Sequence, residues 1–100
     1  MLKQKYCNLL NLCVRYYEYA TGNNFTALAL DSGLWHATVN GSGYRAYMLE
    51  RYLDPKRIPN RFKMSLILKT SDWVLDNYDD KNKLRNNIIN LKNEIENIMF

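Results

Sequence analysis

The stretch Leu28-Ala29-Leu30-Asp31-Ser32-Gly33-Leu34-Trp35-His36-Ala37-Thr38-Val39 decides the fold, because its spacing is that of two helices joined by a tight turn. Ala29 is a small residue that allows the second helix to approach the first closely. Gly33 follows four positions later and tolerates a positive φ angle in the turn without steric cost. The spacing therefore predicts a helix-turn-helix over residues 25–40. The apolar residues expected to point inward and hold the two helices at a steep angle are Leu28, Leu34 and Val39.

A β-hairpin over residues 25–39 is the alternative interpretation, and it predicts an α+β domain. Residues 25–30 alternate in character, residues 34–39 include Trp, Thr and Val, and Asp31-Ser32-Gly33 is an acceptable hairpin connection. We favour the helical interpretation because Ala, Leu and His are poor choices for a strand, and because one helix-turn-helix template explains the small, turn and apolar positions together. The predicted fold class is a small all-α domain.

The composition is that of one globular domain with an excess of positive charge. The chain has 100 residues, of which 47% are hydrophobic and 24% are charged, and its formal net charge is +4. No apolar run is long enough to cross a membrane, and Lys3, Gln4, Lys5 and Asn8 interrupt the start, where a signal peptide would be apolar. We expect a soluble protein without membrane association, located in the cytoplasm of a bacterial host.

Cys7 and Cys13 are expected to be core residues. Their spacing fits neither a zinc site nor a CxxC pair, and no His or further Cys lies near them in the sequence. On one helix they would lie about 9 Å apart along the axis, which is too far for a disulfide. No metal site and no cofactor is predicted. The heavy use of Asn, Lys and Ile is typical of an AT-rich genome and suggests a phage or another mobile element as the source.

Further helices are expected on both sides of the motif. Apolar residues recur every three or four positions over residues 2–20, and Gly22 provides the stop. Asn24 is expected to cap the first helix of the motif, and residues 44–53 are predicted to form another helix that ends before a proline. Residues 61–70 fit either a helix or a strand, because their apolar residues satisfy both periods.

Residues 81–99 are predicted to form the last helix, capped by Asp79-Asp80, whose charges also suit the helix dipole. The chain then divides into residues 1–80, which contain the helix-turn-helix, and residues 81–100, an amphipathic C-terminal helix. Apolar residues of this helix are spaced by four and three, as in a heptad seam, which packs either on its own domain or against a second copy of the chain. The residues of this seam are Leu84, Ile88, Leu91, Ile95 and Ile98.

Residues 25–40 resemble the helix-turn-helix of the Cro/repressor-like family of phage and bacterial DNA-binding proteins. Ser71-Asp72-Trp73-Val74-Leu75 is similar to a segment that often closes repressor-type domains. The resemblance implies a sequence-specific transcriptional regulator that binds double-stranded DNA, as a homodimer on a palindromic operator. The sequence departs from the family at Phe25, where a Gln often contacts phosphate, at Trp35, where Ser or Thr often caps the second helix, and at Gly41, where family members reach bases.

Two groups of residues are predicted to contact DNA. The outward face of the second motif helix would contact base edges in the major groove, with Asn pairing to adenine, His donating to guanine and Ala touching a thymine methyl group. The base-contacting residues are Trp35, His36, Ala37, Thr38 and Asn40. Basic residues after the motif would bind phosphates and supply affinity that is independent of sequence. These residues are Arg45, Lys56, Arg57, Arg61 and Lys63.

No catalytic site is predicted. His36 is the single histidine and lacks evident triad partners, and Asn40-Gly41-Ser42-Gly43 lacks the spacing and the following Lys of a phosphate-binding loop. The alternative function is a small phage-encoded inhibitor or adaptor that binds a host or defence protein. Such a protein would also be basic, rich in Tyr and without catalytic residues.

Overall fold

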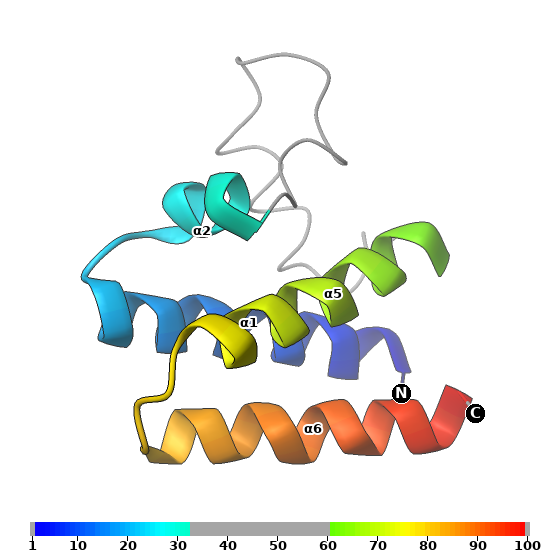
Figure 1. Cartoon of the computed structure of the whole chain (residues 1–100). Coiled ribbons are helices and arrows are strands. Elements are labelled where there is room, and N and C mark those ends of the chain that lie inside the picture. The colour runs from blue at the N-terminus through cyan, green and yellow to red at the C-terminus, as the bar shows by residue number, and fades with distance from the viewer. Residues whose placement is uncertain (1, 33–60, 100) are drawn as a thin grey trace.

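The computed structural model describes residues 2–32 and 61–99, and nearly all of them are helical (Figure 1). The helices are α1 (Leu2–Thr21), α2 (Phe25–Ser32), α5 (Arg61–Asn77) and α6 (Lys83–Met99). No strand occurs in these two described segments, which confirms the predicted all-α class. The hairpin alternative is wrong, because its first strand would have to occupy the residues that form α2.

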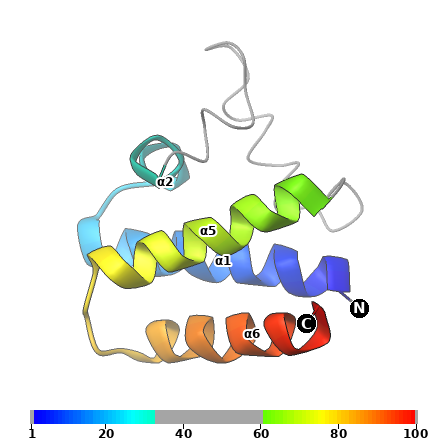
Figure 2. The same cartoon turned by 45° about the vertical axis from the view of Figure 1, so that its right-hand side comes forward.

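α1 is the central helix, and α2, α5 and α6 all pack against it. α5 runs alongside α1 in the same direction, and α6 runs in the opposite direction below them (Figure 1). Figure 2 shows α2 on the other side of this layer, over the carboxyl-terminal half of α1. Among the described elements, α2 contacts α1 and α5.

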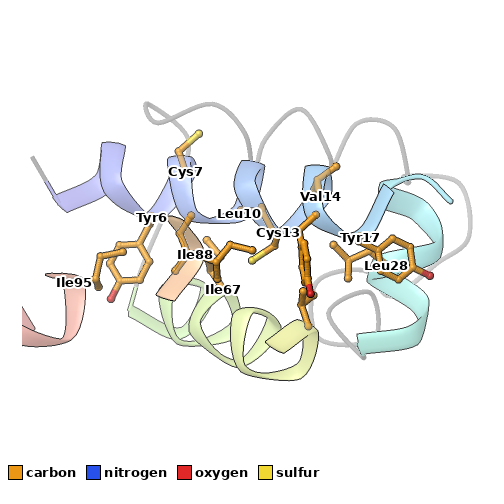
Figure 3. Packing of buried hydrophobic residues seen from close by; sticks show 13 residues of the cluster. Tyr6, Cys7, Leu10, Cys13, Val14, Tyr17, Leu28, Ile67, Ile88 and Ile95 are labelled. Carbon is orange, nitrogen blue, oxygen red and sulfur yellow. The ribbon is translucent and has the colours of Figure 1, made fainter. Parts of the chain in front are cut away.

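The hydrophobic core is built mainly on α1, as Figure 3 shows. Its buried side chains occupy more than one face of the helix, and α2, α5 and α6 pack against it. α2 supplies one buried hydrophobic residue to this core, and α5 and α6 supply two each. Both cysteines are buried here and form no disulfide with each other, as predicted. The core residues are Tyr6, Cys7, Leu9, Leu10, Cys13, Val14, Tyr16 and Tyr17 of α1, Leu28 of α2, Ile67 and Val74 of α5, and Ile88 and Ile95 of α6.

The end of α1 and the start of α2 follow the predicted local chemistry. Gly22 has a φ angle of 76°, and its N–H donates to the carbonyl oxygen of Glu18 at 2.8 Å, which closes α1. Asn24 is the N-cap of α2: its Oδ1 accepts from the Ala27 N–H at 3.2 Å. A left-handed glycine followed two positions later by the N-cap residue makes the tight reversal between the two helices.

Replacing Gly22 by Ala is expected to lower the free energy of unfolding by roughly 1–2 kcal/mol, because a Cβ atom is disfavoured in the left-handed region. No heavy atom lies within 4 Å of the position of that Cβ, so the cost comes from the backbone alone. Gly22→Asn is the matched control, since Asn enters this region more readily than Ala. Urea unfolding should place Gly22→Asn between the parent and Gly22→Ala, and equal stability of the parent and Gly22→Ala would contradict the argument.

The open question for residues 61–70 is answered in favour of a helix, which continues to Asn77 as α5. The buried residues of α5 follow a helical spacing, with Ile67, Thr70, Ser71 and Val74 on the inner face. The hydroxyl of Ser71 donates to the carbonyl oxygen of Leu68 at 2.7 Å, so this polar group is satisfied inside the core.

The predicted start of the last helix was wrong by about one half-turn. α6 begins at Lys83, and its N-cap is Asn82, whose Oδ1 accepts from the Arg85 N–H at 3.0 Å. Asp79 and Asp80 lie in the connection between α5 and α6 instead. An Asn directly before the helix satisfies the free N–H groups better than acidic residues located two or three positions upstream.

The predicted seam of α6 is largely used inside the protein itself. Ile88 and Ile95 have no exposed surface, and Leu84 and Leu91 pack partly buried against the same core. Ile98 is 55% exposed. In a pairing of two copies through α6, Ile98 is therefore available for contact with the second copy. Ile88 and Ile95 already contact the core of their own copy.

Candidate nucleic-acid interface

α2 is the first helix of the predicted motif, and two of its side chains attach it to the core. Leu28 is fully buried. Asp31, one turn further along, accepts a hydrogen bond from the Tyr17 hydroxyl at 2.5 Å. Residues three apart lie on the same face of a helix, so an apolar contact and a polar contact hold one face of α2.

Tyr17 is itself held by two aromatic neighbours. Its ring centroid lies 6.4 Å from that of Trp73 and 5.8 Å from that of Tyr78, and those two rings are 5.9 Å apart. The two pairs that involve Tyr78 are edge-to-face, and such pairs each contribute about 0.5–1.5 kcal/mol beyond burial. Burial first, and then the bond to Asp31 and its negative charge, raise the pKa of Tyr17 to about 12. The hydroxyl is therefore protonated and can donate at neutral pH.

A second polar cluster holds the connection between α5 and α6. The Tyr16 hydroxyl lies 3.0 Å from the carbonyl oxygen of Tyr78 and accepts from the Asp80 N–H at 3.0 Å. Arg85 donates through Nη1 to the carbonyl oxygens of Leu75 and Tyr78, at 3.1 and 2.6 Å. These bonds satisfy carbonyl groups at the carboxyl-terminal end of α5, which a helix leaves without an internal partner.

The predicted base-contacting residues, 35–40, lie outside the described residues, as do Arg45, Lys56 and Arg57. Arg61 and Lys63 are placed by their backbone in the first turn of α5. Positive charge is unfavourable at the amino-terminal end of a helix, and α5 has no acidic residue in this turn to offset it. Helix stability therefore gives no reason for basic residues here, which is consistent with a partner that is negatively charged.

Basic residues are concentrated in one part of the sequence. Residues 45–63 contain six Lys or Arg and two Asp or Glu, so this stretch alone accounts for a net charge of +4, equal to that of the whole chain. Residues 65–100 contain five Lys or Arg and six Asp or Glu. A polyanion would therefore be attracted to the stretch that follows the predicted motif rather than to α6.

Several contacts that position the candidate site could not be found from the sequence. The bond between Tyr17 and Asp31 depends on how α1 and α2 cross. The Tyr16 hydroxyl contacts residues more than 60 positions away, and Arg85 contacts carbonyl groups 7 and 10 positions before it, at the end of the preceding helix. A buried Tyr whose hydroxyl needs a partner is the only pattern that pointed toward them.

The described residues show neither a metal site nor a membrane-spanning helix. Among residues 2–32 and 61–99, no group of three or more His, Cys, Asp or Glu is arranged to hold a metal ion. None of the helices described is both long and apolar enough to cross a membrane.

The fold is similar to that of a solved DNA-binding domain. No protein-family model matches the chain, and no curated protein matches it. The structure is similar to the DNA-binding domain from the sensor histidine kinase ChiS from Vibrio cholerae, with a TM-score of 0.82 and 18% sequence identity. The similarity covers 98% of this chain and 92% of that chain. At this identity the comparison shows a shared fold.

Proposed function

We propose that this chain is a sequence-specific DNA-binding transcriptional regulator that inserts residues 35–40 into the major groove. The observation that supports it most is the fold shared with a DNA-binding domain over 98% of the chain. The formation of α2 in the predicted place and the basic stretch over residues 45–63 add to it. The proposal needs no cofactor and no catalytic residue.

Two kinds of contact carry the proposed binding. One set of side chains contacts base edges and selects the DNA sequence. These residues are Trp35, His36, Ala37, Thr38 and Asn40. Basic side chains contact phosphates and set the affinity for any duplex. The phosphate-contacting residues are Arg45, Lys56, Arg57, Arg61 and Lys63.

The proposal extends to a two-fold dimer on a palindromic operator of a phage or mobile element. A helix-turn-helix monomer contacts one half-site only, and two half-sites about 34 Å apart require two copies of the protein. Of the seam proposed for this pairing, Ile98 is the most exposed residue, so it is the residue of α6 to test.

Arg57→Ala and Arg61→Ala are each expected to weaken binding to every duplex and to lower the slope of log affinity against log salt by roughly one unit. The slope falls because each variant removes one phosphate contact and its released counterion. Fluorescence anisotropy between about 50 and 200 mM salt measures this, on a duplex selected from a random pool and on an unrelated duplex.

Lys83→Ala is the matched control for these variants. It removes the same charge from an exposed residue in the first turn of α6, outside the basic stretch. An equal decrease in Lys83→Ala of the slope of log affinity against log salt would show that DNA is attracted by the net charge of the protein alone. If the parent binds no duplex, or binds in a way that is insensitive to salt, the proposed function is contradicted. The alternative, a protein-binding inhibitor, would then be favoured, and a pull-down from host lysate would identify its target.

A further inference from the structure

Asp31 is placed where electrostatics disfavours a carboxylate. It lies in the last turn of α2, close to the negative end of the helix dipole, and α2 has no basic residue in that turn. A negative charge there would also repel the phosphates of a duplex bound to the proposed interface. Among the described residues, the contact that accounts for this carboxylate is the short hydrogen bond that it accepts from the Tyr17 hydroxyl.

This bond adds a directional contact to the apolar contacts that are described for α2. Leu28 is buried in the core and Ala27 packs against it, but burial of an apolar side chain has no direction. A hydrogen bond is directional, so the contact at Asp31 also fixes the rotation of α2 about its own axis. Rotation of a helix of eight residues redirects the chain that leaves it at Ser32.

The donor is more rigid than an exposed Tyr would be. The Tyr17 ring is 1% exposed and is enclosed by Trp73 and Tyr78 of the α5 segment and the connection that follows it. The position of its hydroxyl is therefore set by the core and not by α2.

We infer that Tyr17 is a positioning residue for DNA recognition: through Asp31 it orients the last turn of α2, the helix that precedes the proposed base-contacting residues 35–40 in the sequence. The inference rests on the proposed function and adds a specificity-determining contact that does not touch DNA. It predicts that loss of this bond reduces discrimination between duplexes more than it reduces affinity for duplexes in general.

The test measures a specificity ratio, the affinity for the selected duplex divided by that for an unrelated duplex. Changes in net charge cancel in this ratio, because phosphate contacts act on both duplexes alike. Tyr17→Phe and Asp31→Ala each remove the bond and should lower the ratio about tenfold. Asp31→Asn keeps an acceptor oxygen for the Tyr17 hydroxyl and should retain the parent ratio, while binding both duplexes somewhat more tightly because a negative charge is gone.

Two further tyrosine variants separate positioning from general damage. Tyr19→Phe removes a hydroxyl from a side chain that is 64% exposed, and it should behave as the parent. Tyr16→Phe removes a buried hydroxyl that holds the connection between α5 and α6, far from α2 in the sequence. It should lower the melting temperature, and because the Tyr16 hydroxyl holds the backbone of Tyr78, whose ring packs on Tyr17, its effect on the ratio should be smaller than that of Tyr17→Phe. The double variant Tyr17→Phe/Asp31→Ala should be no worse than either single variant, since one bond is lost in all three.

The outcomes distinguish the inference from the proposed function. A parent that binds no duplex selectively overturns both. A selective parent whose ratio is unchanged in Tyr17→Phe and Asp31→Ala overturns the inference alone, as does an equal loss of ratio in Tyr19→Phe. If Tyr17→Phe does not fold, Asp31→Ala decides, because it removes an exposed side chain and keeps the Tyr17 ring in the core, at the cost of a buried hydroxyl that loses this acceptor.

Discussion

Ile88→Asp is expected to unfold the domain, whereas Ile98→Asp is expected to retain the helix content of the parent. Ile88 has no exposed surface and lies in the core against α1, so the variant loses its apolar burial, worth about 1.5–3 kcal/mol, and adds the cost of burying a carboxyl group. The total is of the order of 5 kcal/mol, comparable with the whole stability of a small domain. Ile98 belongs to the same helix and is 55% exposed.

Thermal unfolding followed by circular dichroism measures both variants, and sedimentation of the parent and Ile98→Asp measures association. A folded Ile88→Asp protein with parent stability would contradict the packing of α6 on α1. A parent that is dimeric while Ile98→Asp is monomeric would support a dimer through α6. A parent that is monomeric at tens of micromolar would remove the proposed dimer.

A steep loss of stability in alkaline solution is the second large effect expected. In the unfolded chain a Tyr titrates near pH 10, whereas the pKa of Tyr17 in the folded protein is raised to about 12. Below about pH 10 both states hold the proton, and the stabilisation is fully present. As the pH rises from about 10 to 12, the unfolded state loses its proton first, and stability should fall by an amount of the order of 2 kcal/mol.

Other groups with a raised pKa also contribute to the loss of stability as the pH rises. Burial raises the pKa of the Cys13 thiol and of the Tyr6 hydroxyl, and the bond to Asp72 raises the pKa of Lys92. Urea unfolding between about pH 8 and pH 12 should therefore show a decline in the parent that is smaller in Tyr17→Phe, with the difference between the two confined to the range above about pH 10. Equal pH dependence in both proteins would contradict the enclosed environment of Tyr17.

The parts of the fold that were predictable depend on neighbours in the sequence. Gly22 and Asn24 mark the end of α1 and the start of α2 by local backbone chemistry, and both predictions are confirmed. The start of α6 was misplaced because Asp79-Asp80 and Asn82 are all good capping residues, and only the structure shows which one accepts the bond. Residues 61–70 were ambiguous because their apolar residues fit both the helical and the strand period. The burial of Ile67, Thr70 and Val74 follows the helical period.

The candidate site was predictable to a smaller extent. The first motif helix is confirmed as α2, while Gly33 and the base-contacting residues stay predictions because they lie outside the described residues. The contact between Tyr17 and Asp31 requires the crossing of two helices, which no local pattern encodes. The seam of α6 was recognised as apolar, but a heptad spacing is the same whether the helix packs on its own domain or on a partner.

The central position of α1 has a consequence for how the protein is made. α1 is synthesised before α6, yet much of its apolar surface is covered by α6, and the Lys5–Glu94 ion pair joins the two helices. At typical rates of about 5–20 residues per second, α1 waits on the order of seconds for this partner. During that time Tyr6, Leu10 and Cys13 are without part of their native cover, so the nascent chain passes through a stage in which chaperones have an apolar helix to bind.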